Sequence, residues 1–170
     1  MENAHGAAFF SSLLKEVDVS TDRLYQRRYR GFYRVRRKPA WCKPYFALLE
    51  RAKGEALSFN AALRAFCEQT GRVEASFISK LIATIDPTLP VWDQFVIWNL
   101  KLRQPFYHAN QTRRLAERIT VYKEICERVA ALEASTEGAA WIECFDEARP
   151  EFEHFTVTKK VDVFLWLART

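Results

Sequence analysis

Lys80 and Asp93 are the two side chains that are best placed to support chemistry in this sequence. Apolar residues at helical spacing fill one arc of the segment from 74 to 85: Phe77, Ile78, Leu81, Ile82 and Ile85. Lys80 lies outside that arc, beside small residues that would let a ligand approach its ammonium group. Asp93 follows at the expected start of the next helix, where backbone amides favour a carboxylate. A helix-turn-helix arrangement would place the two charged groups on adjoining elements.

A purely structural role is equally open for both residues. A lysine on the polar side of an amphipathic helix is usually solvated. An aspartate at a helix start usually caps the helix, which stabilises it by about 1 kcal/mol.

The stretch from 79 to 96 resembles the core of the helix-hairpin-helix DNA glycosylases. Residues 90–96 (Pro-Val-Trp-Asp-Gln-Phe-Val) are similar to the turn that carries the essential aspartate of that family. Residues 79–83 (Ser-Lys-Leu-Ile-Ala) are similar to the helix that carries the lysine of its bifunctional members. The family's hairpin has a Gly-x-Gly turn, whereas Gly71 is the only glycine near this stretch. Residues 73–100 also resemble a family of small proteins with no assigned function.

The glycosylase resemblance implies a role for each residue of the stretch. It implies a DNA base-excision enzyme that flips the target nucleotide into a pocket between helices. Lys80 would attack the sugar carbon and form a Schiff base, and Asp93 would stabilise the positive charge or activate the amine. Trp92 or another aromatic residue would stack on the flipped base. No cofactor and no metal ion is implied.

A basic segment rich in aromatic residues, 20–45, is the second candidate site. There are nine basic residues and no acidic one between Arg23 and Leu49. Arginine binds phosphate oxygens and aromatic rings stack on bases, so the segment predicts nucleic-acid binding. The glycosylase resemblance favours DNA over RNA as the partner. The predicted contact residues are Arg27, Arg28, Arg30, Arg34, Arg36, Arg37 and Lys38. On a helix, Arg23, Arg27, Arg30 and Arg34 would share one face, opposite Tyr25, Tyr29, Phe32 and Tyr33.

Other interpretations of the charge pattern remain open. Residues 124–155 contain nine acids against only Arg128 and Arg149. The basic segment could therefore pair with this acidic third inside the fold, or opposite faces of two copies could associate. The alternative function is a non-catalytic helical domain that binds nucleic acid or a protein partner.

Several common site types are missing from the sequence. It has neither a phosphate-binding Gly-x-x-x-x-Gly-Lys-Ser/Thr loop nor a dinucleotide-binding Gly-x-Gly-x-x-Gly turn. It also lacks a Gly-x-Ser-x-Gly nucleophile turn and a His-Glu-x-x-His zinc motif. The four cysteines are far apart, which favours buried free thiols over a zinc site.

The pattern of apolar residues predicts an all-α protein, a single irregular helical domain of about eight to nine helices over 1–170, with a glycosylase-like core as one possibility. Apolar residues recur every three or four positions and strand-like alternation is nearly absent. A first helix is expected around Phe9 and Leu14, and a second is expected to be capped by Ser20 or Thr21. Further helices are expected at 74–85, 91–100 and 110–132, and Trp98, Trp141 and Trp166 are expected to anchor the core.

The composition predicts a soluble cytoplasmic protein. The 170 residues are 49% hydrophobic and 28% charged, and the net charge is +5. No apolar run approaches the roughly 18 residues that cross a bilayer, so no membrane association is expected. The first residues lack the basic start of a signal peptide.

Overall fold

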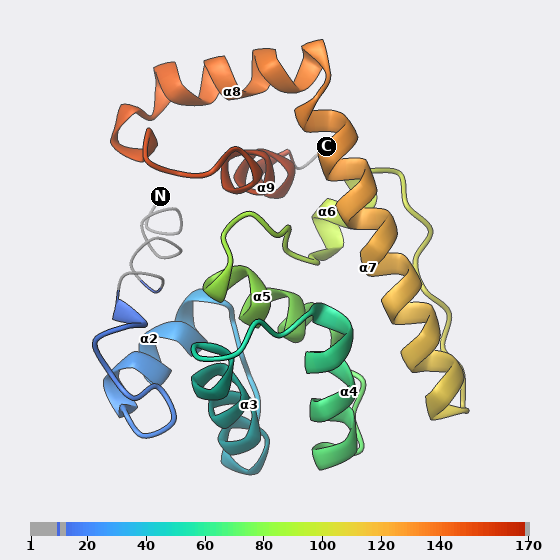
Figure 1. The fold of residues 1–170 in the computed structure, drawn as a ribbon. Coiled ribbons are helices and arrows are strands. Elements are labelled where there is room, and N and C mark those ends of the chain that lie inside the picture. The colour runs from blue at the N-terminus through green and yellow to red at the C-terminus, as the bar shows by residue number, and fades with distance from the viewer. Residues whose placement is uncertain (1–9, 11–12, 169–170) are drawn as a thin grey trace.

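A computed structural model describes residue 10 and residues 13–168, and the regular elements in this part of the chain are all helices (Figure 1). It contains eight α-helices and one 3-10 helix and, within the described residues, no strand. The all-α prediction is confirmed. The helices are α2 (Arg23–Phe32), α3 (Pro39–Ala52), α4 (Phe59–Thr70), α5 (Ala75–Ile85), α6 (Gln94–Asn99), α7 (Gln111–Glu133), α8 (Thr136–Ala148), η1 (Pro150–Phe152) and α9 (Val157–Leu167).

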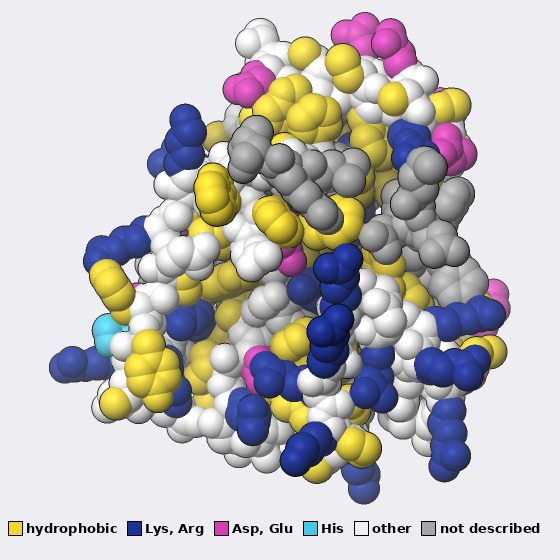
Figure 2. Space-filling model, turned by 180° about the vertical axis from the view of Figure 1, so that it is seen from behind, with side chains coloured by type: hydrophobic (Ala, Val, Ile, Leu, Met, Phe, Trp, Pro, Cys, Tyr) yellow, Lys and Arg dark blue, Asp and Glu magenta, His cyan; other side chains and the backbone are white. Residues whose placement is uncertain are grey.

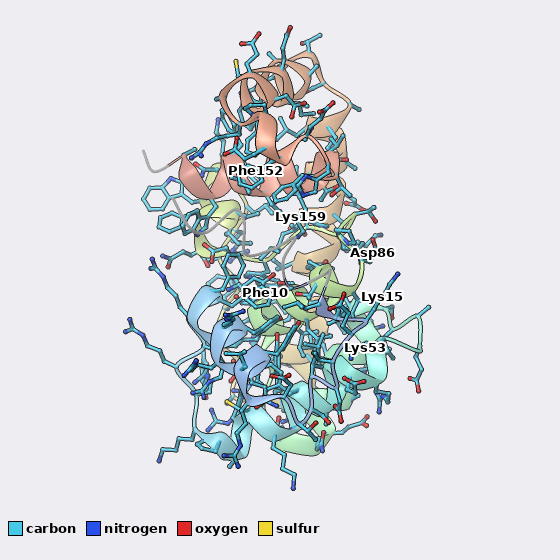
Figure 3. The ribbon with its side chains drawn as sticks, turned by 90° about the vertical axis from the view of Figure 1, so that its left-hand side faces the viewer. Phe10, Lys15, Lys53, Asp86, Phe152 and Lys159 are labelled. Atoms are coloured by element: carbon cyan, nitrogen blue, oxygen red, sulfur yellow. The ribbon has the colours of Figure 1, made fainter. Side chains whose placement is uncertain are left out.

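The helices form two layers that are joined by one long helix. In Figure 1, α2 to α5 make the lower layer, α8 and α9 make the upper layer, and α7 runs along the side of both. The short helix α6 lies between the layers and contacts α9. Figure 3 shows Phe10 in the lower layer and Phe152 and Lys159 in the upper layer.

Local capping fixes where the helices begin and end. Ser58 accepts a hydrogen bond from the amide of Ala61 at the start of α4, and Asn110 does the same for Arg113 in α7. Gly71 ends α4 in the left-handed conformation with φ of 69°, which a glycine adopts without steric cost. The chain therefore turns sharply from α4 into α5, which carries Lys80.

One large core cluster spans both layers. The inner faces of α2 to α5 bury Tyr29, Phe46, Leu63 and Ile78, and α9 adds Leu165 to the same cluster. A smaller cluster of Phe145, Phe152 and Phe155 lies between α8 and α9. Because α9 packs on α6 and α7, its residues reach the segment that carries Asp93.

Two sequence predictions differ from the structure in detail, and a third falls mostly on residues that the structure does not describe. Asp22 caps α2, instead of Ser20 or Thr21, by accepting from the amide of Tyr25 at 2.7 Å. The helix expected at 91–100 is shorter, because Asp93 is its cap and the residues before it are extended. The helix expected around Phe9 lies largely outside the described residues.

The predictions for the cysteines and the tryptophans are confirmed only in part. All four cysteines are free; Cys42 and Cys67 are buried, Cys126 is partly buried and Cys144 is exposed. Trp98 is not a core anchor, since 68% of its surface is exposed.

Among the described residues, no helix has both the length and the apolar character needed to cross a membrane.

Candidate active site

The α5 helix holds Lys80 in a mostly buried position. Only 12% of its side chain is exposed. The ammonium donates to the Ser76 hydroxyl, one helical turn away, at 3.2 Å, and it lies 5.5 Å from the centre of the Phe77 ring. Lys80 is therefore not the solvated surface lysine that its position on the helical wheel also allowed.

Hydrogen bonds fix the extended segment before Asp93 against three helices. The Trp92 amide donates to the Ser79 hydroxyl at 2.8 Å, and the Ser76 hydroxyl donates to the Trp92 carbonyl at 2.9 Å. Tyr122 of α7 donates to the Pro90 carbonyl at 2.9 Å. These bonds hold the backbone next to Asp93 in one place relative to α5.

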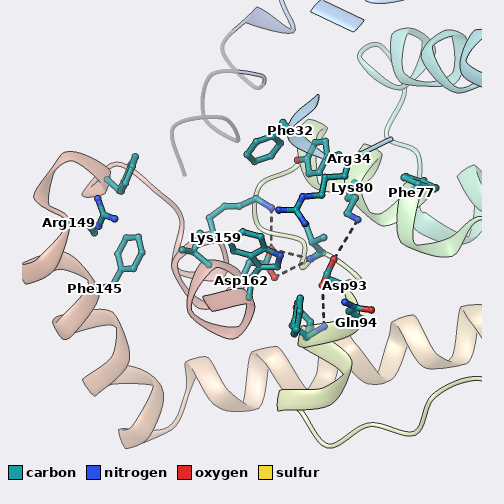
Figure 4. A pocket seen from close by; sticks show the side chains of 17 residues that line it. Phe32, Arg34, Phe77, Lys80, Asp93, Gln94, Phe145, Arg149, Lys159 and Asp162 are labelled. Atoms are coloured by element: carbon teal, nitrogen blue, oxygen red, sulfur yellow. Dashed lines mark hydrogen bonds and ion pairs between the residues drawn. The ribbon is translucent and has the colours of Figure 1, made fainter. Parts of the chain in front are cut away.

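Asp93 combines a capping role with a contact to Lys80. Its carboxylate accepts from the Phe95 amide at 3.1 Å and so caps α6. The same carboxylate lies 3.7 Å from the Lys80 ammonium, and 22% of the Asp93 side chain is exposed. The predicted juxtaposition of the two charged groups is thus present in the folded chain (Figure 4).

The protonation of Lys80 depends on two opposing effects. Burial lowers the pKa of Lys80 because it disfavours the charged ammonium, while the Asp93 carboxylate raises it. Burial is the larger effect, so the pKa of Lys80 lies below its ordinary value of 10.5. More of the neutral, nucleophilic amine is therefore present at neutral pH than for an exposed lysine.

Lys80 and Asp93 line a pocket of about 480 Å³ between the two layers. The size falls within the roughly 300–1,000 Å³ typical of small-molecule sites. Aromatic residues dominate the lining: Phe32, Tyr33, Phe77, Phe95, Phe145, Phe152 and Trp166. Figure 4 shows Lys80, Asp93 and Arg34 around one part of the pocket, with Phe145 and Arg149 on its far side.

A second lysine–aspartate pair in the pocket was not predicted from the sequence. Lys159 and Asp162 of α9 lie 3.2 Å apart, and each side chain is only 9% exposed. Asp162 also accepts from the Val91 amide. Burial raises the pKa of Asp162 to about 6, although Lys159 lowers it. The only local sequence signal was a lysine three residues before an aspartate on one helix, which is common on solvated surfaces.

The predicted basic segment is divided between exposed and anchored residues. Arg27, Arg28, Arg34, Arg36 and Lys38 are exposed, and Figure 2 shows lysine and arginine side chains gathered over the lower half of one face. Tyr25 and Tyr29 are buried, as the predicted aromatic face requires.

Arg30, Arg34 and Arg37 are placed differently from the other basic residues. Arg34 lies beyond the end of α2, at φ of 51°, and lines the pocket, so the predicted four-arginine face stops at Arg30. Arg37 is bound to Glu74 at 2.9 Å. Arg30 donates to the Arg37 carbonyl at 3.1 Å. Arg30 and Arg37 therefore stabilise the basic segment as well as carrying charge.

Trp92 does not line the pocket. Its side chain is only 7% exposed and belongs to the core cluster. The position of Trp92 therefore does not support the stacking role predicted for it, and the aromatic side chains at the pocket are others, among them Phe77 and Phe95.

The acidic C-terminal third does not neutralise the basic segment in the way that the sequence allowed. Within the described part of the chain, Arg23, Arg27 and Arg30 make no ion pair with it. Among the described residues, its ion pairs are formed with near neighbours on α7 to α9, as between Lys123 and Glu127, Lys160 and Asp146, or Arg149 and Glu151.

Comparisons of the chain with protein-family models, with curated proteins and with solved structures found no match. The resemblance to the helix-hairpin-helix glycosylases therefore stays a prediction, and the function is inferred from the geometry.

Proposed function

We propose that this protein is a nucleic-acid-handling enzyme, a DNA base-excision glycosylase or lyase with Lys80 as its nucleophile and Asp93 as its catalytic carboxylate. The observation that carries the proposal is the 3.7 Å contact between the Lys80 ammonium and the Asp93 carboxylate at the wall of an aromatic pocket. A lysine of lowered pKa beside a carboxylate in a concave site is the arrangement that amine nucleophiles use.

The pocket suits a flipped nucleoside. Its aromatic residues offer faces on which a base stacks, an interaction worth about 1–3 kcal/mol per base. Arg34 stands at the same pocket and, within the described residues, makes no ion pair, so its charge is available to a backbone phosphate. The exposed Arg27, Arg28 and Arg36 extend the positive charge along the neighbouring surface.

The chemical step follows from the amine and the carboxylate. The neutral Lys80 amine forms a bond to the sugar C1′, and the glycosidic bond breaks, with its electron pair leaving on the base, which takes up a proton. Asp93 accepts the proton that the attacking nitrogen loses and stabilises positive charge on the sugar before that. The ring oxygen then departs as a hydroxyl and leaves a C=N bond to Lys80, which water hydrolyses.

Borohydride trapping tests the proposal directly. The purified protein is incubated with duplexes that carry an abasic site, uracil or 8-oxoguanine, and borohydride reduces any C=N bond to a stable adduct. Lys80→Ala removes the nucleophile. Lys123→Ala is the matched control, because Lys123 is a lysine on α7 with a 78% exposed side chain, outside the pocket.

The expected result is an adduct with wild type and Lys123→Ala that is absent with Lys80→Ala. An adduct that persists in Lys80→Ala would exclude Lys80 as the nucleophile. If no substrate gives an adduct or loses its base, the enzymatic proposal is wrong.

A non-catalytic nucleic-acid-binding domain is the second candidate. The observation that favours it is the structural use of both residues, since Asp93 caps α6 and Lys80 bonds to Ser76. In that case DNA would be retained at low salt without an adduct, and Lys80→Ala would bind as wild type does.

A further inference from the structure

Three large aromatic side chains are exposed on and after α6, away from the pocket. The exposed fractions are 68% for Trp98, 52% for Phe106 and 80% for Tyr107. None of the three lines the pocket. Contiguous exposed apolar side chains on a folded domain commonly mark an interaction site.

Charged side chains hold the backbone of this segment against α7. The Phe106 amide donates to the Glu117 carboxylate at 3.0 Å, and Arg118 donates to the Phe106 carbonyl at 3.2 Å. Glu117 and Arg118 are themselves paired at 2.6 Å. His108 lies 3.6 Å from the same carboxylate. The fold therefore fixes the backbone on both sides of the Phe106 ring and leaves the ring facing solvent.

An arginine side chain lies beside the Phe106 ring and another beside the Tyr107 ring. The Arg103 guanidinium carbon lies 4.0 Å from the centre of the Phe106 ring, and that of Arg114 lies 5.4 Å from the centre of the Tyr107 ring. Guanidinium groups on aromatic faces leave their N–H donors free to bind phosphate oxygens.

Most of the charge around the rings is positive, and the one carboxylate at the Phe106 amide, that of Glu117, is itself paired with Arg118. The sequence has no acidic residue from 94 to 116, and its basic residues there are Lys101, Arg103, Arg113 and Arg114. Lys101, Arg103 and Arg113 are exposed. Aromatic faces interleaved with cations suit the bases and phosphates of a nucleic-acid strand.

We propose that the surface formed by Phe106, Tyr107, Arg103, Arg113 and Arg114 binds unpaired bases of a nucleic-acid strand. Tyr107 and Phe106 stack on successive bases, and the arginines contact the flanking phosphates. The inference deepens the proposed function, because it rests on nucleic acid being the partner and adds a second contact outside the pocket. The Gln111 side chain ties this surface to the α4–α5 turn by donating to the Gly71 carbonyl at 2.8 Å.

Fluorescence anisotropy with a short labelled oligothymidylate and with a duplex of the same length tests this surface while Lys80 stays intact. Tyr107→Leu keeps an apolar side chain but removes the ring, and Tyr107→Phe keeps the ring. Arg103→Gln with Arg113→Gln removes two cations, and Lys123→Gln is the control because Lys123 is an exposed α7 cation without a ring contact.

The expected result is tighter binding of the single strand than of the duplex. Tyr107→Leu should raise the Kd for the single strand by about 5- to 150-fold, the range that loss of one stacked base gives. Tyr107→Phe and Lys123→Gln should bind as wild type does. The arginine double variant should lower the slope of log Kd against log salt by about 1.4, since each phosphate contact contributes about 0.7 on a single strand.

Three outcomes would overturn the proposed surface, and the first of them leaves the enzyme proposal standing. If wild type binds the oligonucleotide and Tyr107→Leu binds equally well, the surface is wrong while nucleic-acid binding and the adduct test stand. If wild type binds neither form, nucleic acid is not the partner, and both proposals fail. Concentration-dependent self-association that Tyr107→Leu abolishes, without oligonucleotide binding, would assign the surface to a protein contact instead.

Discussion

Asp93→Asn separates the charge of Asp93 from its capping role. Asparagine is as good a helix cap as aspartate, so the substitution keeps the acceptor for the Phe95 amide and removes only the negative charge beside Lys80. Lys80 then stays mostly buried without its ionic partner, because only 12% of its side chain is exposed.

The size of the effect follows from the geometry of the pair. Two unit charges 3.7 Å apart attract each other by about 4 kcal/mol at an effective dielectric of 20 and by about 1 kcal/mol at that of water. The exposed fractions of 12% and 22% place this pair between the two limits. We therefore expect Asp93→Asn to lower the free energy of unfolding by about 1–4 kcal/mol at neutral pH. The pKa of Lys80 should fall further, since the group that raises it is gone.

Urea denaturation gives the stability, and NMR of reductively ¹³C-methylated protein gives the pKa of Lys80. The loss of stability should shrink as the pH rises through the pKa of Lys80, because a neutral amine needs no carboxylate. Asp93→Ala should lower the free energy of unfolding by about 1 kcal/mol more than Asp93→Asn does, because it also removes the helix cap. Lys80→Met combined with Asp93→Asn closes a double-mutant cycle.

A coupling free energy below about 0.5 kcal/mol, together with an unchanged pKa of Lys80, would refute the reasoning. Lys80 and Asp93 would then not interact in solution, and Asp93 could not serve as the catalytic carboxylate for Lys80.

Three further substitutions test the surroundings of the pair. Ser79→Ala should lower the free energy of unfolding, measured by urea denaturation, by about 1–3 kcal/mol, because it leaves the buried Trp92 amide without its acceptor at 2.8 Å. A decrease below about 0.5 kcal/mol would show that this hydrogen bond does not hold the turn. Burial raises the pKa of Asp162 from 3.8 to about 6, so between these pH values the folded state binds more protons than the unfolded chain. The free energy of unfolding of wild type relative to Asp162→Asn should therefore fall by up to about 3 kcal/mol as the pH rises from about 4 to 7. A difference that does not change with pH would contradict the raised pKa. The pKa of Lys80 is lowered in the folded protein, so between that pKa and 10.5 the unfolded chain binds more protons than the folded one. The free energy of unfolding of wild type relative to Lys80→Met should therefore rise with pH between these two values. A difference that falls with pH would contradict the effect of burial.

Much of the local structure was predictable because helix signals act over a few residues. Asn110 caps α7 where the sequence predicted a helix to begin, and 74–85 is helical as α5, within one residue. The proximity of Lys80 and Asp93 was predictable for the same reason, because the two residues are close in sequence and only one turn separates their helices.

The errors arose where distant residues decide the outcome. The 91–100 helix is shortened because the Trp92 and Val91 amides donate to Ser79 and Asp162 instead of entering a helix. Trp98 is exposed although its residue type predicted burial, and Trp92 is buried although a binding role predicted exposure. Residue type gives an average preference for the interior, and packing of the neighbouring helices decides each case.

The sequence by itself determined the helical class, most helix ends, the basic segment and the pairing of a lysine with an aspartate across one turn, because these depend on periodicity, caps and charge along the chain. Only the tertiary structure decided that α9 lines the same pocket as Lys80, that Asp162 belongs to that lining and that Phe106 and Tyr107 face solvent. Burial and electrostatic shifts depend on groups brought together from distant parts of the chain, and no local pattern encodes which of them meet.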